Sequence, residues 1–228
     1  MNLPNLGFAA VSMLAATIWG SADVAARPPV EVRCETPTVV VHSARRKDAL
    51  TACEGARDAI VFLASQGMKV DVPLSIDLVE ALPPDASDSA AGCYLAAEHR
   101  AVVLSYPALT KQGSWFKIKV DRDLYRSLVT HEVAHSVAAA NFKPTQPAIQ
   151  AHEYIAYVTM FAAMPPGQRE RVLSEYPGNG FEHDAQMSLT IYMIDPMRFG
   201  VQAWRHFLGQ TSGRDYLHAV LAGDALAE

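Results

Sequence analysis

The first half of the chain alternates between strand-like and helix-like patterns. Residues 36–42 are rich in β-branched side chains, which predicts a strand. Residues 47–66 repeat apolar side chains at helical spacing and end at Gly67, which predicts a helix. Residues 70–79 predict a second strand. A strand, a helix and a strand in succession favour a crossover unit on a small sheet.

A hairpin is predicted after this unit. Residues 83–92 are polar and predict a loop. Residues 93–96 and 101–106 have strand-like patterns on either side of a short polar segment, residues 98–100. This arrangement is typical of two antiparallel strands.

The pattern becomes helical after residue 120. Asp121 or Asp123 can cap a helix that runs to about Ala140. Thr145 can cap the next helix, which ends before Pro165. Further helices are predicted at residues 168–175, 183–194, 197–209 and 213–222. The expected fold class is therefore α+β, with a small mixed sheet and a crossover helix in an N-terminal lobe (residues 27–120) and a mainly helical C-terminal lobe (residues 121–228) of a single domain.

The N-terminus has the pattern of an export signal. Residues 2–22 contain no charged side chain, and residues 8–19 are mostly apolar. Small residues follow, with Ala22, Ala25 and Ala26 as candidate cleavage sites. This pattern predicts a signal peptide over residues 1–26 and a periplasmic or secreted protein. An uncleaved anchor and a folded N-terminal helix are the alternatives.

Composition narrows the possible partners. Half of the 228 residues are apolar and 19% are charged, which is typical of a globular chain with a real core. The formal net charge is −5, so nucleic acid is not an expected partner. In the predicted mature chain no apolar run is long enough to span a bilayer, so no stable membrane span is expected there.

The three cysteines all lie in the predicted mature chain. In an oxidising compartment they allow one disulfide and leave one thiol. If the first strand extends back to Cys34, that residue lies roughly 17 Å from the level of Cys53 on the helix, too far for a disulfide. The favoured pair is therefore Cys53–Cys93, with Cys34 free. Three buried thiols are the alternative.

The most specific motif is His131-Glu132-Val133-Ala134-His135, which matches H-E-x-x-H. Positions i and i+4 lie on one face of a helix, so both imidazoles can bind one zinc ion. The adjacent Glu132 can then act as a general base on a zinc-activated water molecule. The alternative is a buried helix whose two histidines are only part of the core. The surrounding helix is apolar on two faces, so polar side chains there need partners.

A third ligand is expected from the next helix. Glu153 follows His135 by 18 residues, and the short turn between the two helices makes them neighbours. Ile149, Ala156 and Met160 share the face of Glu153, and a carboxylate on an apolar face needs a partner or a metal ion. His152 lies about 100° away around the helix, so it is not expected to be a ligand.

His131-Glu132-x-x-His135 followed by Glu153-x-x-Ala156 resembles the gluzincin group of zinc metallopeptidases, the thermolysin-like and aminopeptidase-like superfamily. The resemblance covers about residues 95–165 in detail. It implies a zincin-like domain with one Zn²⁺ per chain, held by His131, His135 and Glu153, and Glu132 as the catalytic base. It also implies that an edge strand holds an extended substrate, for which residues 101–105 are the candidate; a plain hairpin strand is the alternative for these residues.

Two features of the group have no fixed counterpart in this sequence. Thermolysin-like enzymes have an aspartate four residues after the glutamate ligand, and here that position is Tyr157. Asp184, Asp195 or a backbone carbonyl could orient His131 instead. The group also uses a downstream Tyr or His to stabilise the developing negative charge on the substrate. The candidates for that role are His183, Tyr192, Tyr154 and Tyr157.

The predicted function is that of an exported zinc-dependent metallopeptidase with a peptide or protein substrate. One alternative is a zinc-binding zincin-fold protein with another hydrolytic activity or with no catalysis. The other is a non-enzymatic exported binding module.

Overall fold

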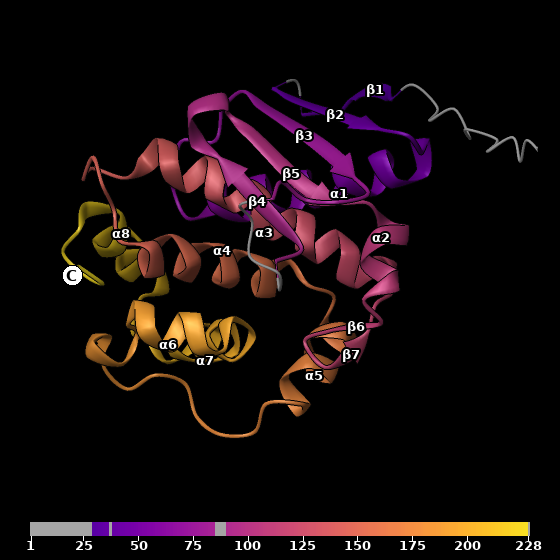
Figure 1. Ribbon diagram of the computed structural model, residues 1–228. Helices are drawn as coiled ribbons and strands as arrows, with labels where there is room; N and C mark the ends of the chain where they lie inside the picture. The colour runs from indigo at the N-terminus through magenta and orange to yellow at the C-terminus, as the bar shows by residue number, and fades with distance from the viewer. Residues whose placement is uncertain (1–28, 37, 85–89, 228) are drawn as a thin grey trace, which may run out of the picture.

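The computed structural model describes residues 29–36, 38–84 and 90–227, so the predicted signal peptide lies outside the described residues. A five-stranded mixed sheet forms the upper layer of the molecule (Figure 1), in the order β1-β2-β3-β5-β4. The inner three strands are parallel, and the two edge strands are antiparallel to their neighbours. The strands are β1 (Val30–Arg33), β2 (Val39–Ser43), β3 (Leu74–Val79), β4 (Gly92–Leu95) and β5 (Arg100–Leu104).

The predicted crossover unit is confirmed. Helix α1 (Arg46–Ser65) connects β2 to β3, which pair in parallel. The predicted hairpin is also confirmed, because β4 and β5 pair antiparallel around a 3₁₀ turn at Ala96–Glu98. Alternate side chains of β2 and β3 are buried, as expected for strands with one face on the core.

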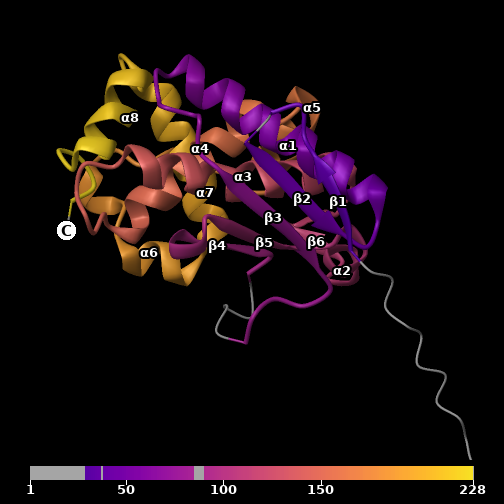
Figure 2. The same ribbon diagram turned by 90° about the horizontal axis from the view of Figure 1, so that it is seen from above.

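Helices cover one face of the sheet in successive layers (Figures 1 and 2). Helix α1 and helix α3 (Arg122–Asn141) pack side by side under the sheet. Helix α4 (Ile149–Ala163) packs against α3 on the side away from the sheet, and α7 (Pro196–Gly209) packs against α4. The remaining helices are α2 (Tyr106–Lys111), α5 (Pro166–Ser174), α6 (Leu189–Ile194) and α8 (Gly213–Ala222). The α+β fold class is confirmed.

Several boundaries differ from the prediction. Helix α4 begins at Ile149 and not at Thr145, because the residue before Pro147 is disfavoured in helical conformation. The predicted helix over residues 183–194 is two pieces, a 3₁₀ turn at Asp184–Gln186 and α6, whose N-terminus Ser188 caps. Strand β5 ends at Leu104 because Ser105 caps α2, accepting a hydrogen bond from the Ala108 N–H at 3.3 Å.

The disulfide prediction is wrong. The structure joins Cys34 to Cys53, whose Cα atoms lie 5.2 Å apart, and Cys93 is outside that bond. The error lies in the assumed strand: the chain reverses after β1, so Cys34 lies beside Val39 at the start of β2. Cys34 is therefore close to the level that Cys53 reaches on α1. A disulfide fits a protein of an oxidising, extracellular compartment.

None of the helices within residues 29–36, 38–84 and 90–227 combines the length and the apolar character needed to cross a bilayer.

Candidate metal centre

Helix α3 carries the H-E-x-x-H motif through the centre of the molecule. Asp121 caps its N-terminus, accepting a hydrogen bond from the Leu124 N–H at 2.9 Å. From Leu124 to Ala138 nearly every side chain is buried, because the sheet and α1 cover one side and α4 the other. His131 and His135 lie one turn apart and face α4.

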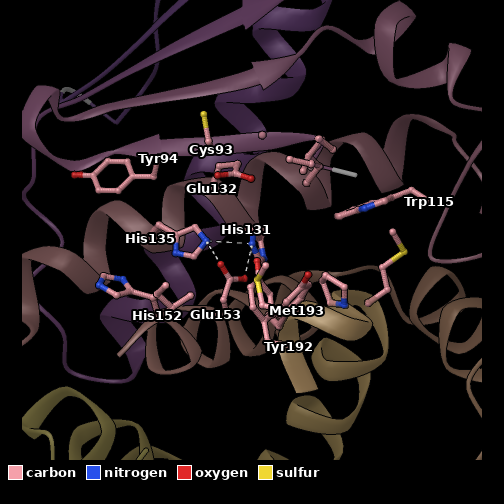
Figure 3. Close-up of a pocket in the computed structure, with 18 of the residues that line it drawn as sticks. Cys93, Tyr94, Trp115, His131, Glu132, His135, His152, Glu153, Tyr192 and Met193 are labelled. Atoms are coloured by element: carbon pink, nitrogen blue, oxygen red, sulfur yellow. Dashed lines mark hydrogen bonds and ion pairs between the residues drawn. The ribbon is translucent and has the colours of Figure 1, made fainter. Parts of the chain in front are cut away.

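Glu153 on α4 completes a group of three side chains that can hold a metal ion (Figure 3). The Nε2 atoms of His131 and His135 lie 3.1 Å apart. The Glu153 carboxylate oxygens lie 3.5 Å from His131 Nε2 and 3.6 Å from His135 Nε2. Three ligands about 2.1 Å from one tetrahedral zinc ion lie roughly 3.4 Å from one another. The three side chains are therefore close enough together to surround one zinc ion.

Burial and the charge of Glu153 shift the pKa values of the two histidines in opposite directions. Burial lowers the pKa of His131, but its hydrogen bond to Glu153 and the Glu153 charge outweigh burial and raise that pKa overall. Burial lowers the pKa of His135 to about 3, even though the Glu153 charge opposes the change. A neutral imidazole is the form that binds a metal, so His135 is held in the ligating form.

Glu153 is a buried carboxylate held in its charged form. Burial raises its pKa, but the nearby His135 and His131 together with a hydrogen bond from Tyr192 lower it overall. Its Oε2 atom is buried, and apart from the ion pair with His131 Nε2 at 3.5 Å it has no hydrogen-bond partner among the described residues; His131 Nδ1 is also buried without one. A carboxylate oxygen left in this way is costly unless a cation satisfies it. The donor set of two imidazoles and one carboxylate therefore suits zinc.

Glu132 lies between strand β4 and the two histidines (Figure 3). Gly92 of β4 lies directly against its carboxylate, so close that a Cβ there would be 2.5 Å from Glu132 Oε1. Burial raises the pKa of Glu132 to about 7, the Glu153 charge also raises it, and His131 opposes the change. A carboxyl group whose pKa lies near neutral pH is suited to general-base catalysis.

The four residues border one cavity of about 470 Å³, a volume typical of sites for small molecules and peptide side chains. Strand β4, helix α3, helix α4 and helix α6 all contribute to its lining. The lining residues are Ala90, Ala91, Gly92, Cys93, Tyr94, Ala96, Trp115, Leu128, His131, Glu132, His135, Ile149, His152, Glu153, Tyr157, Tyr192, Met193, Pro196 and Met197.

The edge strand that borders the cavity is β4, and the prediction of residues 101–105 for that position is wrong. Those residues belong to β5, which lies between β3 and β4 in the sheet. In the β4–β5 hairpin the first strand, β4, lies at the edge of the sheet. The strand patterns in the sequence did not predict which of the two strands would be outermost. Gly92, Cys93 and Tyr94 of β4 line the cavity.

The candidates for orienting His131 have other partners. Asp184 accepts a hydrogen bond from the Tyr216 hydroxyl at 2.7 Å, and Asp195 caps helix α7. Tyr157 itself lies against His131, with ring centroids 4.4 Å apart. Burial raises the pKa of Tyr157 well above its usual range, so it stays neutral. The imidazole of His131 is thus positioned by an aromatic contact in place of a carboxylate.

Of the candidates for stabilising negative charge, Tyr192 lies in the cavity, and its hydroxyl donates a hydrogen bond to Glu153. His183 is not among the described residues that line the cavity, because it lies exposed at the start of the 3₁₀ turn. The Tyr154 hydroxyl is hydrogen-bonded to His206 Nδ1 at 2.9 Å, on the side of α4 away from the cavity. His152 lies beside His135 in the cavity, with ring centroids 6.1 Å apart, and is not part of the metal-binding group.

Trp115 is a cavity residue that the sequence patterns did not identify. It ends strand β6 (Ser114–Trp115), which pairs with β7 (Ile118–Lys119) around a turn of Phe116 and Lys117. Both turn residues have positive φ, 52° and 60°, in a position that favours Asn or Gly. The closest feature in the sequence is the pair of adjacent aromatic residues, Trp115 and Phe116. Two neighbouring residues show neither a helical nor a strand period, so the pattern did not predict this hairpin.

Packing compensates for this backbone conformation. A non-glycine residue in the left-handed region costs about 1–3 kcal/mol. Phe116 is 0% exposed and contacts the rings of Tyr157, Phe161 and Tyr176 at centroid distances of 5.6–6.1 Å. Burial of a Phe side chain contributes about 1.5–3 kcal/mol, and each aromatic pair adds about 0.5–1.5 kcal/mol. The two left-handed turn residues together cost about 2–6 kcal/mol and the packing contributes about 3–7.5 kcal/mol, so packing offsets the backbone cost and holds Trp115 in place.

Comparison with known proteins identifies the family. The chain belongs to a family of unknown function, DUF6639, whose family model matches residues 39–228. This match includes the whole metal-binding group, Glu132 and the cavity lining. No curated protein and no solved structure matched the chain.

Proposed function

We propose that this protein is an exported zinc-dependent metallopeptidase. The observation that carries the proposal is the group of His131, His135 and Glu153, whose imidazole Nε2 atoms lie 3.1 Å apart and 3.5 and 3.6 Å from the two carboxylate oxygens, in the same cavity as the buried carboxylate of Glu132. Two imidazoles and one carboxylate with a fourth position open to a cavity are the ligand set of hydrolytic zinc sites. A zinc ion in such a site polarises a carbonyl group and lowers the pKa of a water molecule.

Glu132 is the proposed general base. Its carboxylate accepts a proton from the attacking water, whose oxygen forms a bond to the carbonyl carbon of the peptide. The same carboxyl group then delivers that proton to the amide nitrogen as the carbon–nitrogen bond breaks. Gly92 and the surrounding apolar residues exclude bulk water from Glu132, so the proton remains within the site.

Tyr192 is the proposed donor to the carbonyl oxygen. It lies on α6 at the side of the cavity, and its hydroxyl already reaches Glu153. Burial and the Glu153 charge both raise its pKa, so the hydroxyl keeps its proton and can donate it in a hydrogen bond. A donor at this position stabilises the negative charge that develops on the carbonyl oxygen.

Strand β4 is the proposed support for the substrate backbone. It is an edge strand of the sheet, paired on one side by β5, and its Gly92–Tyr94 segment borders the cavity. An edge strand can add an extended peptide through main-chain hydrogen bonds. Such binding gives affinity with little dependence on sequence, which suits a peptide or protein substrate.

The proposal is tested by hydrolysis of casein and of a mixed peptide library by the purified protein. We expect turnover that a chelator abolishes and added zinc restores. Glu132→Gln keeps the shape of the side chain and removes the base, so the variant should retain zinc while its turnover falls by about 10²- to 10⁴-fold.

A matched control is His152→Ala, which removes a cavity residue beside His135 and keeps the proposed base and all three proposed ligands. This variant should keep both its zinc and most of its turnover. Equal rates for the wild-type protein and Glu132→Gln would refute the mechanism. Zinc binding without hydrolysis of any peptide would refute the peptidase activity.

A further inference from the structure

The outer edge of the His131 imidazole has no hydrogen bond that fixes its orientation. Its Nδ1 atom is buried without a partner among the described residues, while Nε2 faces Glu153 at 3.5 Å and His135 at 3.1 Å. Histidines that bind a metal almost always donate their other ring N–H to a carboxylate, a carbonyl group or water, which fixes the ring. In this chain the orientation of His131 therefore depends on what packs against its ring.

Tyr157 is the residue that packs there. Its ring centroid lies 4.4 Å from that of His131, and it leaves the same face of α4 as Glu153, one helical turn later. Tyr157 is 5% exposed and is bordered by the rings of Phe116 and Phe199 at centroid distances of 6.1 and 6.4 Å. Because these neighbours leave it little room, a displacement of the Tyr157 ring is transmitted to His131.

Helix α7 closes the remaining side of the Tyr157 ring at Gly200. A Cβ at Gly200 would lie 2.5, 2.7 and 2.8 Å from Cδ1, Cγ and Cε1 of that ring. Contacts this short require the ring or the helix to move. Gly200 is buried inside α7, which packs against α4 (Figure 1). Glycine inside a helix is unfavourable relative to alanine, so the close approach of the ring accounts for glycine at this position.

Contacts on its other sides hold α7 in place. Asp195 caps the helix, accepting a hydrogen bond from the Arg198 N–H at 2.9 Å. The Arg205 guanidinium donates hydrogen bonds to the backbone carbonyls of Tyr176 and Leu173 at 2.6 and 3.1 Å. The helix backbone therefore resists displacement, and a group added at its contact with α4 moves the tyrosine ring instead.

We propose that Gly200 is a positioning residue for the metal-binding group, acting through Tyr157 on His131. The α7 backbone holds the Tyr157 ring at the distance that leaves His131 Nε2 directed at Glu153 and His135. This role rests on the metal binding that the proposed function requires. It makes zinc affinity depend on the packing of a helix that carries none of the three ligands.

Zinc affinity, measured by competition with a chromophoric chelator, tests this role in the purified chain. Gly200→Ala is expected to weaken zinc binding by about 10- to 100-fold, the range typical of groups that orient a metal ligand. Gly209→Ala is the matched control, because it adds the same methyl group to the same helix where no atom of the described residues lies within 4 Å of it. It should bind zinc as the wild type does. Equal affinities of Gly200→Ala and the wild type would overturn the proposal.

Variants of Tyr157 separate positioning from a general loss of stability. Tyr157→Phe keeps the ring and should bind zinc nearly as the wild type does, whereas Tyr157→Leu should weaken binding by about 10- to 100-fold. Gly200→Ala added to Tyr157→Leu should cause no further loss, because the ring that it displaces is gone. Losses that multiply in the double variant would overturn the proposal. If circular dichroism shows that Gly200→Ala alone does not fold, equal affinities of the two Tyr157 variants would overturn it.

The NMR signals of the His131 imidazole in the metal-free protein give a readout that does not need zinc. The Tyr157 ring lies close enough for its ring current to act on the imidazole protons. Gly200→Ala should shift these signals and leave those of the exposed His218 on α8 unchanged. Unchanged His131 signals would overturn the proposal.

The outcomes also separate this role from the peptidase proposal. Zinc affinity that depends on Gly200 and Tyr157, without hydrolysis of any peptide, would support the positioning role and overturn the peptidase. Peptide hydrolysis by the wild type, together with unchanged zinc affinity in Gly200→Ala, would overturn the positioning role and leave the peptidase intact. A wild-type chain that binds no zinc would overturn both.

Discussion

Gly92 of strand β4 lies against the carboxylate of Glu132 with no room for a side chain. A Cβ at position 92 would lie 2.5 Å from Glu132 Oε1 and 2.7 Å from its Cδ. Contacts this short force one of the two groups to move. A glycine within a strand often marks such a close approach, and here the approach fixes the position of the proposed base between the edge strand and the metal-binding group.

Gly92→Ala is therefore expected to displace the Glu132 carboxylate while the three ligands stay in place. Misplacement by about 1 Å can reduce turnover by about 10²-fold. Zinc content and peptide hydrolysis measure the two effects separately. Gly167→Ala is the control, since no atom of the described residues lies within 4 Å of a Cβ added there. A Gly92→Ala protein with wild-type turnover would show that the position of Glu132 is not critical.

Tyr192→Phe tests the proposed hydrogen bond to the substrate. Loss of one such donor typically lowers kcat by about 10²- to 10³-fold. We expect that decrease in kcat, with KM changed by no more than a few-fold and zinc retained. If the variant instead loses its zinc at unchanged kcat for the loaded fraction, Tyr192 serves to hold Glu153 and the catalytic role is wrong.

Phe116→Ala tests whether aromatic packing holds the β6–β7 hairpin. Removal of a buried Phe side chain costs about 3–5 kcal/mol in the free energy of unfolding, which urea denaturation measures. Lys117→Ala is the control, because Lys117 has the same left-handed backbone but is exposed, with its ammonium 4.3 Å from the Tyr176 ring centroid. Its effect should be less than about 1 kcal/mol. If both variants lost similar amounts of unfolding free energy, aromatic packing of Phe116 would not be what holds the hairpin.

The disulfide is expected to contribute measurably to stability. Cys34 and Cys53 are separated by 19 positions, and closing a loop of this size stabilises the fold by about 3 kcal/mol through the unfolded chain. Cys34→Ser should lower the free energy of unfolding by about that amount, as measured under non-reducing conditions. Cys93→Ser leaves the disulfide intact and should change stability by less than about 1 kcal/mol. Peptide mapping that joins Cys93 to Cys53 would contradict this pairing.

The proposed metal-binding group was accessible to sequence reasoning because helix geometry is local. The i, i+4 spacing of His131 and His135 fixes their relation without knowledge of the rest of the fold. Glu153 required one further step, the short turn between α3 and α4, and the buried face on which it lies supplied the reason. The structure brings all three together as predicted.

Features that depend on distant contacts were not accessible in the same way. Residues 30–33 are too short and too exposed to show a strand period, so β1 and the reversal that brings Cys34 to Cys53 were missed. Phe116 adopts a turn conformation that its residue type disfavours, and only the aromatic cluster around it explains why. Register and edge position in the sheet likewise follow from pairing between distant segments.

Zinc content per chain is the most direct test of the metal centre. Inductively coupled plasma mass spectrometry of the purified, zinc-equilibrated protein should give one zinc per wild-type chain. His135→Ala and Glu153→Ala should each give far less than one, because each removes one of three ligands. His152→Ala, next to Glu153 in the chain, should still give one. A wild-type chain without zinc, or a Glu153→Ala chain that holds it as fully as His152→Ala, would contradict the account.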